Sequence, residues 1–160
     1  MTGGVLGYLI DKLGTGNFNT ITEPEAVDCI YRSGTSAQGD IVNVTGDLNS
    51  IMAGLACGEP NPVTWQVLRD CSNYFASVDD GVTATGMRVL GNPLQGDPKV
   101  VSGESGAVTL GLLYKLCSDV SNKALVQELG LNEDSVILVF SSEGDTNADR
   151  YRDIVWDAKY

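Results

Sequence analysis

The chain has 160 residues, 42% of them hydrophobic, with a mean hydropathy of −0.01 and 21 acidic against 10 basic residues. This length and apolar content are typical of a single domain with a buried core, and they argue against a disordered chain or a membrane protein. The net charge of −11 and the lack of a basic stripe argue against a nucleic-acid partner. The sequence has no apolar run of membrane-spanning length and no basic leader, so we expect a cytoplasmic protein with no membrane partner.

The first half of the chain alternates helical and extended patterns. Apolar residues at helical spacing predict a helix over residues 3–13, and residues 19–22 read as a short strand. The Glu23-Pro24-Glu25 run predicts the start of a second helix, because proline suits the first helical turn. A polar, glycine-rich loop follows over residues 33–46, and the small apolar residues of 50–58 resemble a pocket wall.

The middle of the chain carries clear boundary signals. Asn61-Pro62 predicts the start of a helix that continues to Cys71, and residues 74–78 are a strand candidate. Asp79-Asp80 then predicts the cap of a helix that runs through Val89, followed by a loop over residues 91–99 that contains two prolines.

A glycine-rich turn over residues 101–106 leads directly into an apolar helix. The helix from Ala107 is apolar on nearly all sides, which predicts burial, while Gly106 and Gly111 allow another element to approach its backbone. The free N–H groups of its first turn can receive a ligand. Glu104 in the same turn would repel an anion, so we expect a carboxylate beside a neutral or cationic part of a cofactor, or a simple helix cap.

The last part of the chain predicts a helix, a strand and a final helix. Residues 123–129 form a helical pattern that ends at Gly130, a typical left-handed position after a helix. Residues 135–140 are apolar at successive positions, which predicts a strand buried on both faces. Thr146 or Asn147 is expected to cap the last helix.

Short buried strands that alternate with helices predict an α/β fold, with a parallel sheet and flanking helices, in which residues 1–160 form a single domain piece. Ligands in such sheets bind beyond the C-terminal ends of the strands. The Ser141-Ser142 pair lies at that end of the predicted strand 135–140, and its two hydroxyls serve either a ligand or a tight turn.

The cysteines and the absence of histidine exclude several kinds of site. The four cysteines form no CxxC pair and there is no histidine, so a zinc finger and a Ser-His-Asp or Cys-His catalytic arrangement are excluded. We expect reduced thiols, and the sequence leaves open whether Cys29 meets Cys57.

Several stretches together resemble the diaminopropionate ammonia-lyase family. They are 53–62 (AGLACGEPNP), 86–90 (GMRVL), 102–108 (SGESGAV), 142–146 (SEGDT), 29–34 (CIYRSG) and 154–156 (IVW). More remotely, residues 50–54 and 104–107 look like the matching stretches of serine racemase and threonine deaminase. The resemblance implies the C-terminal part of the large domain of a fold type II pyridoxal-phosphate enzyme, which is similar to the β subunit of tryptophan synthase.

The resemblance also implies a function and its partners. The family catalyses α,β-elimination of 2,3-diaminopropionate, an amino-acid substrate, to pyruvate and ammonia with pyridoxal phosphate. The family's Schiff-base lysine and its catalytic aspartates correspond to positions before Met1, and no lysine here lies in a similar motif. We therefore expect no catalytic residue in the chain, only a partial cofactor pocket, and an N-terminal half or a homo-oligomer as partner. The alternative is a non-catalytic remnant or an assembly module.

The resemblance assigns cofactor-binding roles to a few residues. Ser142, with Ser141 as the alternative, is similar to the hydroxyl that faces the pyridine nitrogen, and Glu104 to a residue beside the cofactor ring. Gly3 and Gly4 are similar to the edge of the loop that binds the cofactor phosphate, and Gly54 to a residue of the pocket wall. Two further carboxylates, Glu23 and Asp28, resemble cation ligands of serine racemase, but their spacing is imperfect and we expect no metal.

Overall fold

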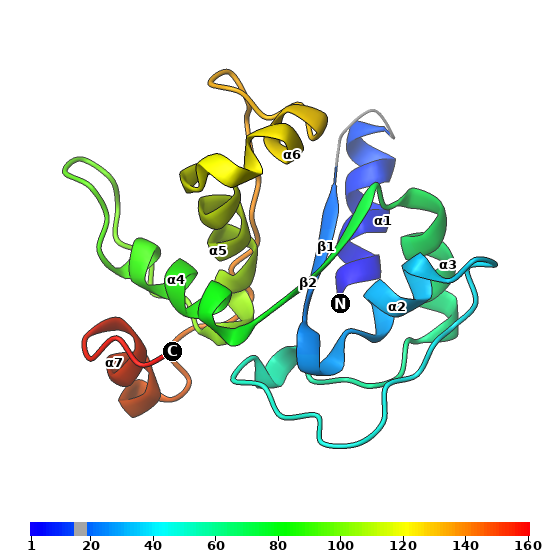
Figure 1. Cartoon of the computed structure of the whole chain (residues 1–160), viewed down its shortest axis with the longest axis horizontal. Coiled ribbons are helices and arrows are strands. Elements are labelled where there is room, and N and C mark those ends of the chain that lie inside the picture. The colour runs from blue at the N-terminus through cyan, green and yellow to red at the C-terminus, as the bar shows by residue number, and fades with distance from the viewer. Residues whose placement is uncertain (15–18) are drawn as a thin grey trace. The chain divides into compact units, whose positions relative to one another are not determined.

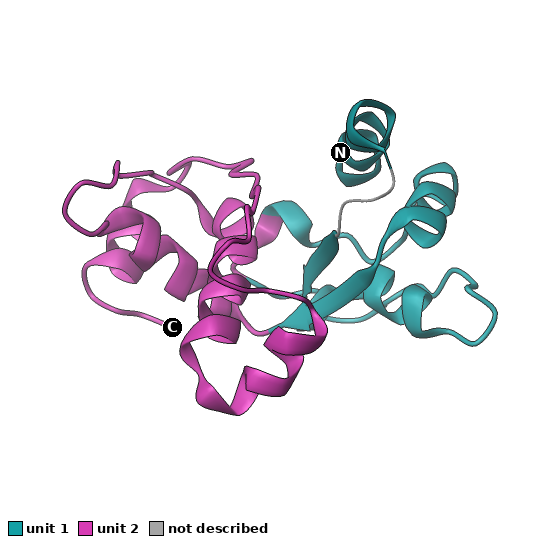
Figure 2. Ribbon diagram, turned by 90° about the horizontal axis from the view of Figure 1, so that it is seen from above, with its two compact units in different colours: residues 1–50, 54–78 teal, residues 51–53, 79–160 magenta. Residues whose placement is uncertain are grey.

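A computed structural model describes residues 1–14 and 19–160 of the chain (Figure 1). The structure divides into two compact units, shown in different colours in Figure 2. The first unit comprises residues 1–50 and 54–78, and the second comprises residues 51–53 and 79–160. Because each unit has its own hydrophobic cluster, we describe the two separately.

The first unit is built on two parallel strands, β1 (Thr20–Pro24) and β2 (Tyr74–Val78). Thr20 pairs with Tyr74 at one end and Pro24 with Val78 at the other. The strands are far apart in sequence, and a long connection of this kind is what a parallel pair requires. The prediction of an α/β fold with parallel strands is confirmed.

The helices of the first unit pack against this pair of strands and against each other. They are α1 (Thr2–Leu13), the short 3₁₀ helix η1 (Glu25–Val27), α2 (Cys29–Thr35) and α3 (Pro62–Cys71). A further 3₁₀ turn, η2, covers Ala53–Leu55. Leu6, Trp65 and Leu68 are buried together between α1 and α3.

The helix that we expected to begin at Glu23-Pro24-Glu25 begins later. Pro24 is the last residue of β1, with φ −69° and ψ 138°, because its backbone continues the pairing with Val78. The chain then makes one 3₁₀ turn before α2 starts at Cys29.

The second unit is helical. It contains α4 (Asp80–Gly91), α5 (Glu104–Ser118), η3 (Val120–Asn122), α6 (Lys123–Glu128) and α7 (Ala148–Val155). The first two helices pack closely along their lengths, and α7 packs against α4. Their core consists of buried Ile51, Ala84, Met87, Ala107, Tyr151, Ile154 and Val155.

Local capping signals placed three helix starts correctly. Asn61 accepts hydrogen bonds from the N–H groups of Val63 and Thr64 at the start of α3. Asp79 likewise caps α4, and Asn147, not Thr146, caps α7. Gly130 has the expected left-handed conformation after α6, with φ +68°.

The prediction of a helix buried on all sides holds only for the first half of α5. Residues 104–108 and Gly111 are buried, whereas Tyr114 is 47% exposed. The reason is that α4 covers one face of α5, and the short elements η3 and α6 contact the helix without burying Tyr114.

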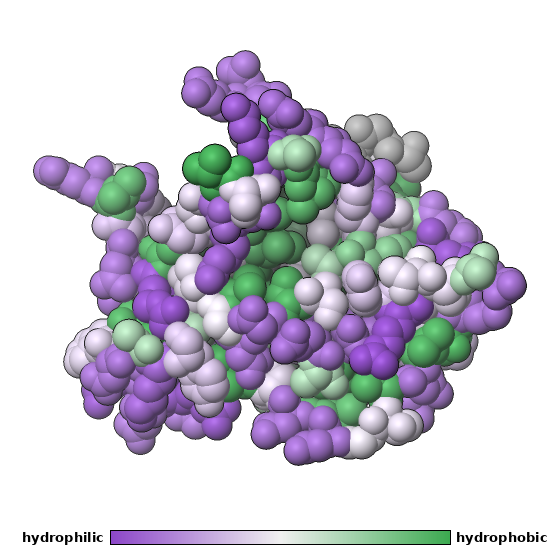
Figure 3. All heavy atoms as spheres, in the orientation of Figure 1, coloured by the Kyte–Doolittle hydropathy of each residue, from purple (hydrophilic) through white to green (hydrophobic). Residues whose placement is uncertain are grey.

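The predicted buried strand at 135–140 is wrong for this chain. The segment has no strand assignment, and the exposed fractions of Val136, Ile137, Leu138 and Phe140 are 99%, 46%, 65% and 47%. An apolar run is buried on both faces only where neighbouring strands and helices enclose it. Among the described residues, the sheet has only β1 and β2, so these side chains face solvent. In the space-filling view, hydrophobic residues are visible at the surface among hydrophilic ones (Figure 3).

Within residues 1–14 and 19–160, no helix has both the length and the apolar character needed to cross a membrane.

Candidate functional site

The N-terminal end of α5 is the best-ordered polar site of the second unit. Ser102 is fully buried, and Glu104 and Ser105 are 7% and 8% exposed. The hydroxyl of Thr83 on α4 donates a hydrogen bond to the backbone oxygen of Glu104. Hydroxyls and a carboxylate therefore come together at one helix end, as the glycine-rich pattern predicted.

Residues 141–143 lie directly against this helix end. The Ser141 hydroxyl is 2.8 Å from the Ser102 hydroxyl, and the Gly103 N–H donates to the Glu143 backbone oxygen at 2.8 Å. The Glu143 carboxylate accepts a hydrogen bond of 2.6 Å from the Ser105 N–H. These contacts place Ser142, which is exposed, at the same helix end as Glu104.

The ligand that we expected at the first turn of α5 is replaced there by a side chain of the protein. An N–H group at this end, that of Ser105, already binds the carboxylate of Glu143. Sequence reasoning had included Glu143 in a motif but had given it no role. Its acidic side chain in a turn that follows an apolar segment was the available signal.

Arg150 compensates part of the negative charge at this site. Its Nε lies 3.8 Å from Oε1 of Glu104, whose side chain is 10% exposed. Sequence analysis did not single out Arg150, because nothing in its neighbourhood indicates that α7 returns to α5.

The glycines assigned to the phosphate loop lie at the start of α1 in the first unit. Gly3 is buried, and a Cβ atom there would collide with the Thr64 side chain, which lies on α3. Gly4 is exposed, its N–H donates to the Met1 backbone oxygen at 3.0 Å, and no atom lies within 4 Å of the place for a Cβ. Gly3 thus has a packing role, and phosphate binding by either glycine stays a prediction.

Gly54 belongs to the short 3₁₀ turn Ala53–Leu55 and is exposed. Its place in the pocket wall also stays a prediction. In the second unit, Ile51 and Met52 are buried, and the Ile51 N–H donates to the carboxylate of Asp80 at 3.2 Å. This bond fastens residues 51–53 to the start of α4.

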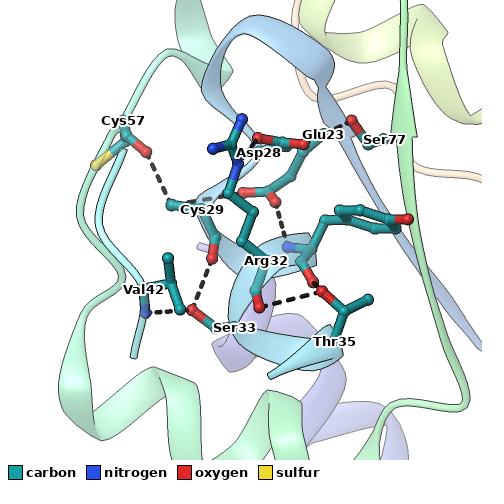
Figure 4. Close-up of polar contacts among 10 residues, drawn as sticks. Glu23, Asp28, Cys29, Arg32, Ser33, Thr35, Val42, Cys57 and Ser77 are labelled. Atoms are coloured by element: carbon teal, nitrogen blue, oxygen red, sulfur yellow. Dashed lines mark hydrogen bonds and ion pairs between the residues drawn. The ribbon is translucent and has the colours of Figure 1, made fainter. Parts of the chain in front are cut away.

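A second polar cluster lies where β1 meets α2 in the first unit (Figure 4). Glu23 is 8% exposed, and its carboxylate accepts a hydrogen bond of 2.8 Å from the Tyr31 N–H. Burial raises the pKa of Glu23 to about 7, against the lowering effect of the hydrogen bonds from the Tyr31 and Ile30 backbone. The neighbouring Asp28 pairs with Arg32 at 2.6 Å and accepts a bond of 2.9 Å from the Ser77 hydroxyl.

The carboxylates of Glu23 and Asp28 are therefore engaged by the protein itself. Within the described residues, no three His, Cys, Asp or Glu side chains are grouped so that they could hold a metal ion. Glu23 acts as an acceptor for the first turn of α2, and Asp28 connects α2 to β2.

Cys29 and Cys57 meet in space. The Cys29 thiol donates to the Cys57 backbone oxygen at 3.0 Å and lies 3.8 Å from a carboxylate oxygen of Glu23 (Figure 4). Both cysteines are reduced. Burial, together with the negative charge of Glu23, raises the pKa of Cys29 to about 12.

All five lysines of the chain, at positions 12, 99, 115, 123 and 159, are exposed. Lys12 pairs with Asp11, and Lys159 pairs with Asp153. The expectation that these side chains are solvated is confirmed.

Comparison with known proteins shows extensive similarity to one group of enzymes. The chain is 54% identical over 161 residues to the diaminopropionate ammonia-lyase of Escherichia coli K12, which covers 100% of the chain and 40% of that enzyme. The crystal structure of the E. coli enzyme in complex with D-serine matches 99% of the chain and 39% of its own length, with a TM-score of 0.90 and 51% identity. No protein-family model matches the chain.

Two more distant structures share the fold. A bacterial threonine deaminase, from T.th., has a TM-score of 0.60 at 22% identity over 72% of the chain. Maize serine racemase has a TM-score of 0.63 at 20% identity over 98% of the chain. The fold is therefore that of the fold type II pyridoxal-phosphate enzymes, and the chain spans about 40% of the length of the curated relatives.

Proposed function

We propose that this chain, which is a portion of a diaminopropionate ammonia-lyase in sequence and fold, contributes the ring-nitrogen side of a pyridoxal-phosphate site. The observation that carries this proposal is the attachment of residues 141–143 to the start of α5, which holds the Ser142 hydroxyl beside Glu104. In this proposal the complete enzyme converts 2,3-diaminopropionate to pyruvate and ammonia by α,β-elimination.

The residues present fit part of the cofactor. Ser142 is exposed and supplies a hydroxyl, which can donate a hydrogen bond to a ring nitrogen. Glu104 is buried but has Arg150 as a charged partner, so its carboxylate can remain ionised beside a ring. Pyridoxal phosphate, when bound, supplies an electron sink for the negative charge that forms on the substrate α-carbon.

The chain's own contribution is to orient and to moderate. A hydroxyl partner donates a hydrogen bond to the ring nitrogen but does not hold a proton there as a carboxylate would, which favours elimination at the β-carbon. The glycines at the start of α1 offer backbone N–H groups to a phosphate. The groups that transfer protons and the lysine that binds the cofactor covalently are assigned to the rest of the enzyme.

The partner in this proposal is a polypeptide that carries the rest of the family's fold. The exposed apolar side chains of residues 136–140 support it, because such a run is stable when another strand pairs with it. Self-association of the chain would use the same surface.

The test compares the purified chain alone with the chain co-expressed with the remaining part of the E. coli relative. Each sample receives pyridoxal phosphate and 2,3-diaminopropionate, ammonia is measured, and borohydride reduction followed by peptide mapping locates any modified lysine. We expect ammonia only from the combined chains and no single stoichiometrically modified lysine in the chain alone. Ammonia release by the chain alone, with one such lysine, contradicts the division of roles. A stable complex that never releases ammonia favours the assembly-module alternative.

A further inference from the structure

Glu143 caps α5 from a distant part of the sequence. The N-cap residue of α5 is Gly103, which has no side chain to satisfy the first N–H groups of the helix. The Glu143 carboxylate, 38 residues further along the chain than Ser105, accepts the Ser105 N–H at 2.6 Å. A carboxylate in this position is also stabilised by the helix dipole.

The backbone of Glu143 is held at the same place. Its carbonyl oxygen accepts the Gly103 N–H at 2.8 Å. A Cβ on Gly103 would lie 2.7 Å from Cγ of Glu143, and a Cβ on Gly106 would lie 3.0 Å from the Glu143 N and O atoms. The two glycines thus leave room for Glu143, which packs directly on the first turn of α5.

Ser142 stands between two anchored neighbours. Glu143 is fixed on one side by the two bonds to α5, and Ser141 is fixed on the other by its hydroxyl contact with the fully buried Ser102. Ser142 itself is exposed. Its backbone therefore has little freedom while its hydroxyl remains accessible to a ligand.

We propose that Glu143 is a positioning residue, which holds residues 141–143 on the first turn of α5 and thereby directs the Ser142 hydroxyl toward the ring nitrogen of pyridoxal phosphate. This inference rests on the proposed function, and it assigns Glu143 a role through Ser142 without contact with the cofactor.

The first experiment measures amide hydrogen exchange in the chain itself. Glu143→Ala removes the acceptor of the Ser105 N–H, whereas Glu143→Gln keeps an oxygen of similar reach. Glu133, an exposed acid of the same unit, provides the matched control Glu133→Ala. Loss of a charged acceptor should speed exchange of the Ser105 amide by about tenfold or more. Glu143→Gln should have a smaller effect and Glu133→Ala none. Unchanged Ser105 exchange in Glu143→Ala overturns the proposal.

The second experiment records the visible absorption of pyridoxal phosphate in the complex of the chain with the remaining part of the enzyme. Glu143→Ala should change the spectrum in the same direction as Ser142→Ala, and the double variant should show no further change. Glu143→Gln should restore much of the wild-type spectrum.

The outcomes separate this inference from the proposed function. If Ser142→Ala alters the spectrum while Glu143→Ala leaves it as in the wild type, the positioning role is overturned and the proposed function stands. If the wild-type complex gives no cofactor signal, the proposed function fails and the positioning role fails with it. Additive spectral changes in the double variant also overturn the positioning role, because they show that Glu143 acts independently of Ser142.

Discussion

Gly86 of α4 lies directly against the backbone of Ala107 in α5. A Cβ on Gly86 would collide with the Ala107 carbonyl oxygen and would lie 2.8 Å from the Gly111 nitrogen. Gly111 has the reciprocal relationship with Val82 of α4. Because neither helix has a side chain at this crossing, the two backbones approach closely and bury Ala84 and Ala107 completely. The packing of α4 on α5, and with it the position of Glu104, depends on these glycines.

Gly86→Ala should therefore destabilise the second unit. The added methyl meets backbone atoms that cannot rotate away, so the helices must separate, at a cost of about 1–3 kcal/mol or more. Urea unfolding monitored by circular dichroism measures the effect. Gly7→Ala in α1 is the matched control, because nothing lies within 4 Å of its Cβ position and the change should be neutral or stabilising. Equal stability of Gly86→Ala and the wild type would contradict the close crossing.

Glu23 should make the stability of the first unit fall as pH rises from about 4.5 to about 7. The folded pKa of about 7 lies above the ordinary value of 4.5, so in this window the folded state binds more protons than the unfolded state. Stability then decreases with rising pH and stays reduced above pH 7, by at most about 3 kcal/mol.

The measurement is the free energy of unfolding across this pH range for the wild type and for Glu23→Gln. The glutamine keeps an acceptor for the Tyr31 N–H but cannot titrate, so its stability should be less dependent on pH. Glu25→Gln, an exposed neighbour, should retain the wild-type pH profile. A Glu23→Gln profile parallel to the wild type would show that Glu23 is not the group responsible.

Ser142→Ala should lower the turnover of the reconstituted enzyme by about tenfold, with the cofactor still bound, because one hydrogen bond is worth about 1 kcal/mol and each 1.4 kcal/mol changes a rate tenfold. Ser142→Thr should retain most activity, since it keeps the hydroxyl. Steady-state kinetics and the visible spectrum of the cofactor measure both. If Ser142→Ala has no effect and Ser141→Ala abolishes turnover, Ser141 is the residue that faces the nitrogen.

The exposed apolar side chains of residues 136–140 should bind hydrophobic dyes and cause self-association. Val136→Asp and Leu138→Asp place charges on side chains that are 99% and 65% exposed, so they should reduce both effects without unfolding the chain. Sedimentation at micromolar concentration and dye fluorescence measure the change. Val63→Asp, at an exposed site on α3, is the matched control. A wild-type chain that is sharply monomeric and binds no dye would refute this prediction.

The four thiols should differ in reactivity. Cys29 is buried and its pKa is raised to about 12, so almost no thiolate is present at neutral pH, whereas Cys57 and Cys117 are exposed. Alkylation followed by mass spectrometry should label the two exposed cysteines rapidly and Cys29 only after unfolding. Labelling of Cys29 at the rate of Cys57 would show that the cluster around Glu23 opens readily.

Local signals in the sequence determined most helix boundaries and both strands. Asn61, Asp79 and Asn147 satisfy backbone groups within three residues of themselves, so their role is independent of the rest of the fold. Gly130 likewise needs only a left-handed conformation after α6. The quoted motifs also identified the enzyme family, because they depend on residue identity alone.

Only the tertiary structure decided which groups meet. The cap of α5 by Glu143 and the contact of Cys29 with Cys57 join residues 38 and 28 positions apart, and no local pattern encodes such pairings. The apolar run at 136–140 was predicted as a buried strand because apolarity states a tendency to be covered. Whether it is covered depends on neighbouring strands, and among the described residues the two paired strands lie elsewhere in sequence, so this run remains exposed.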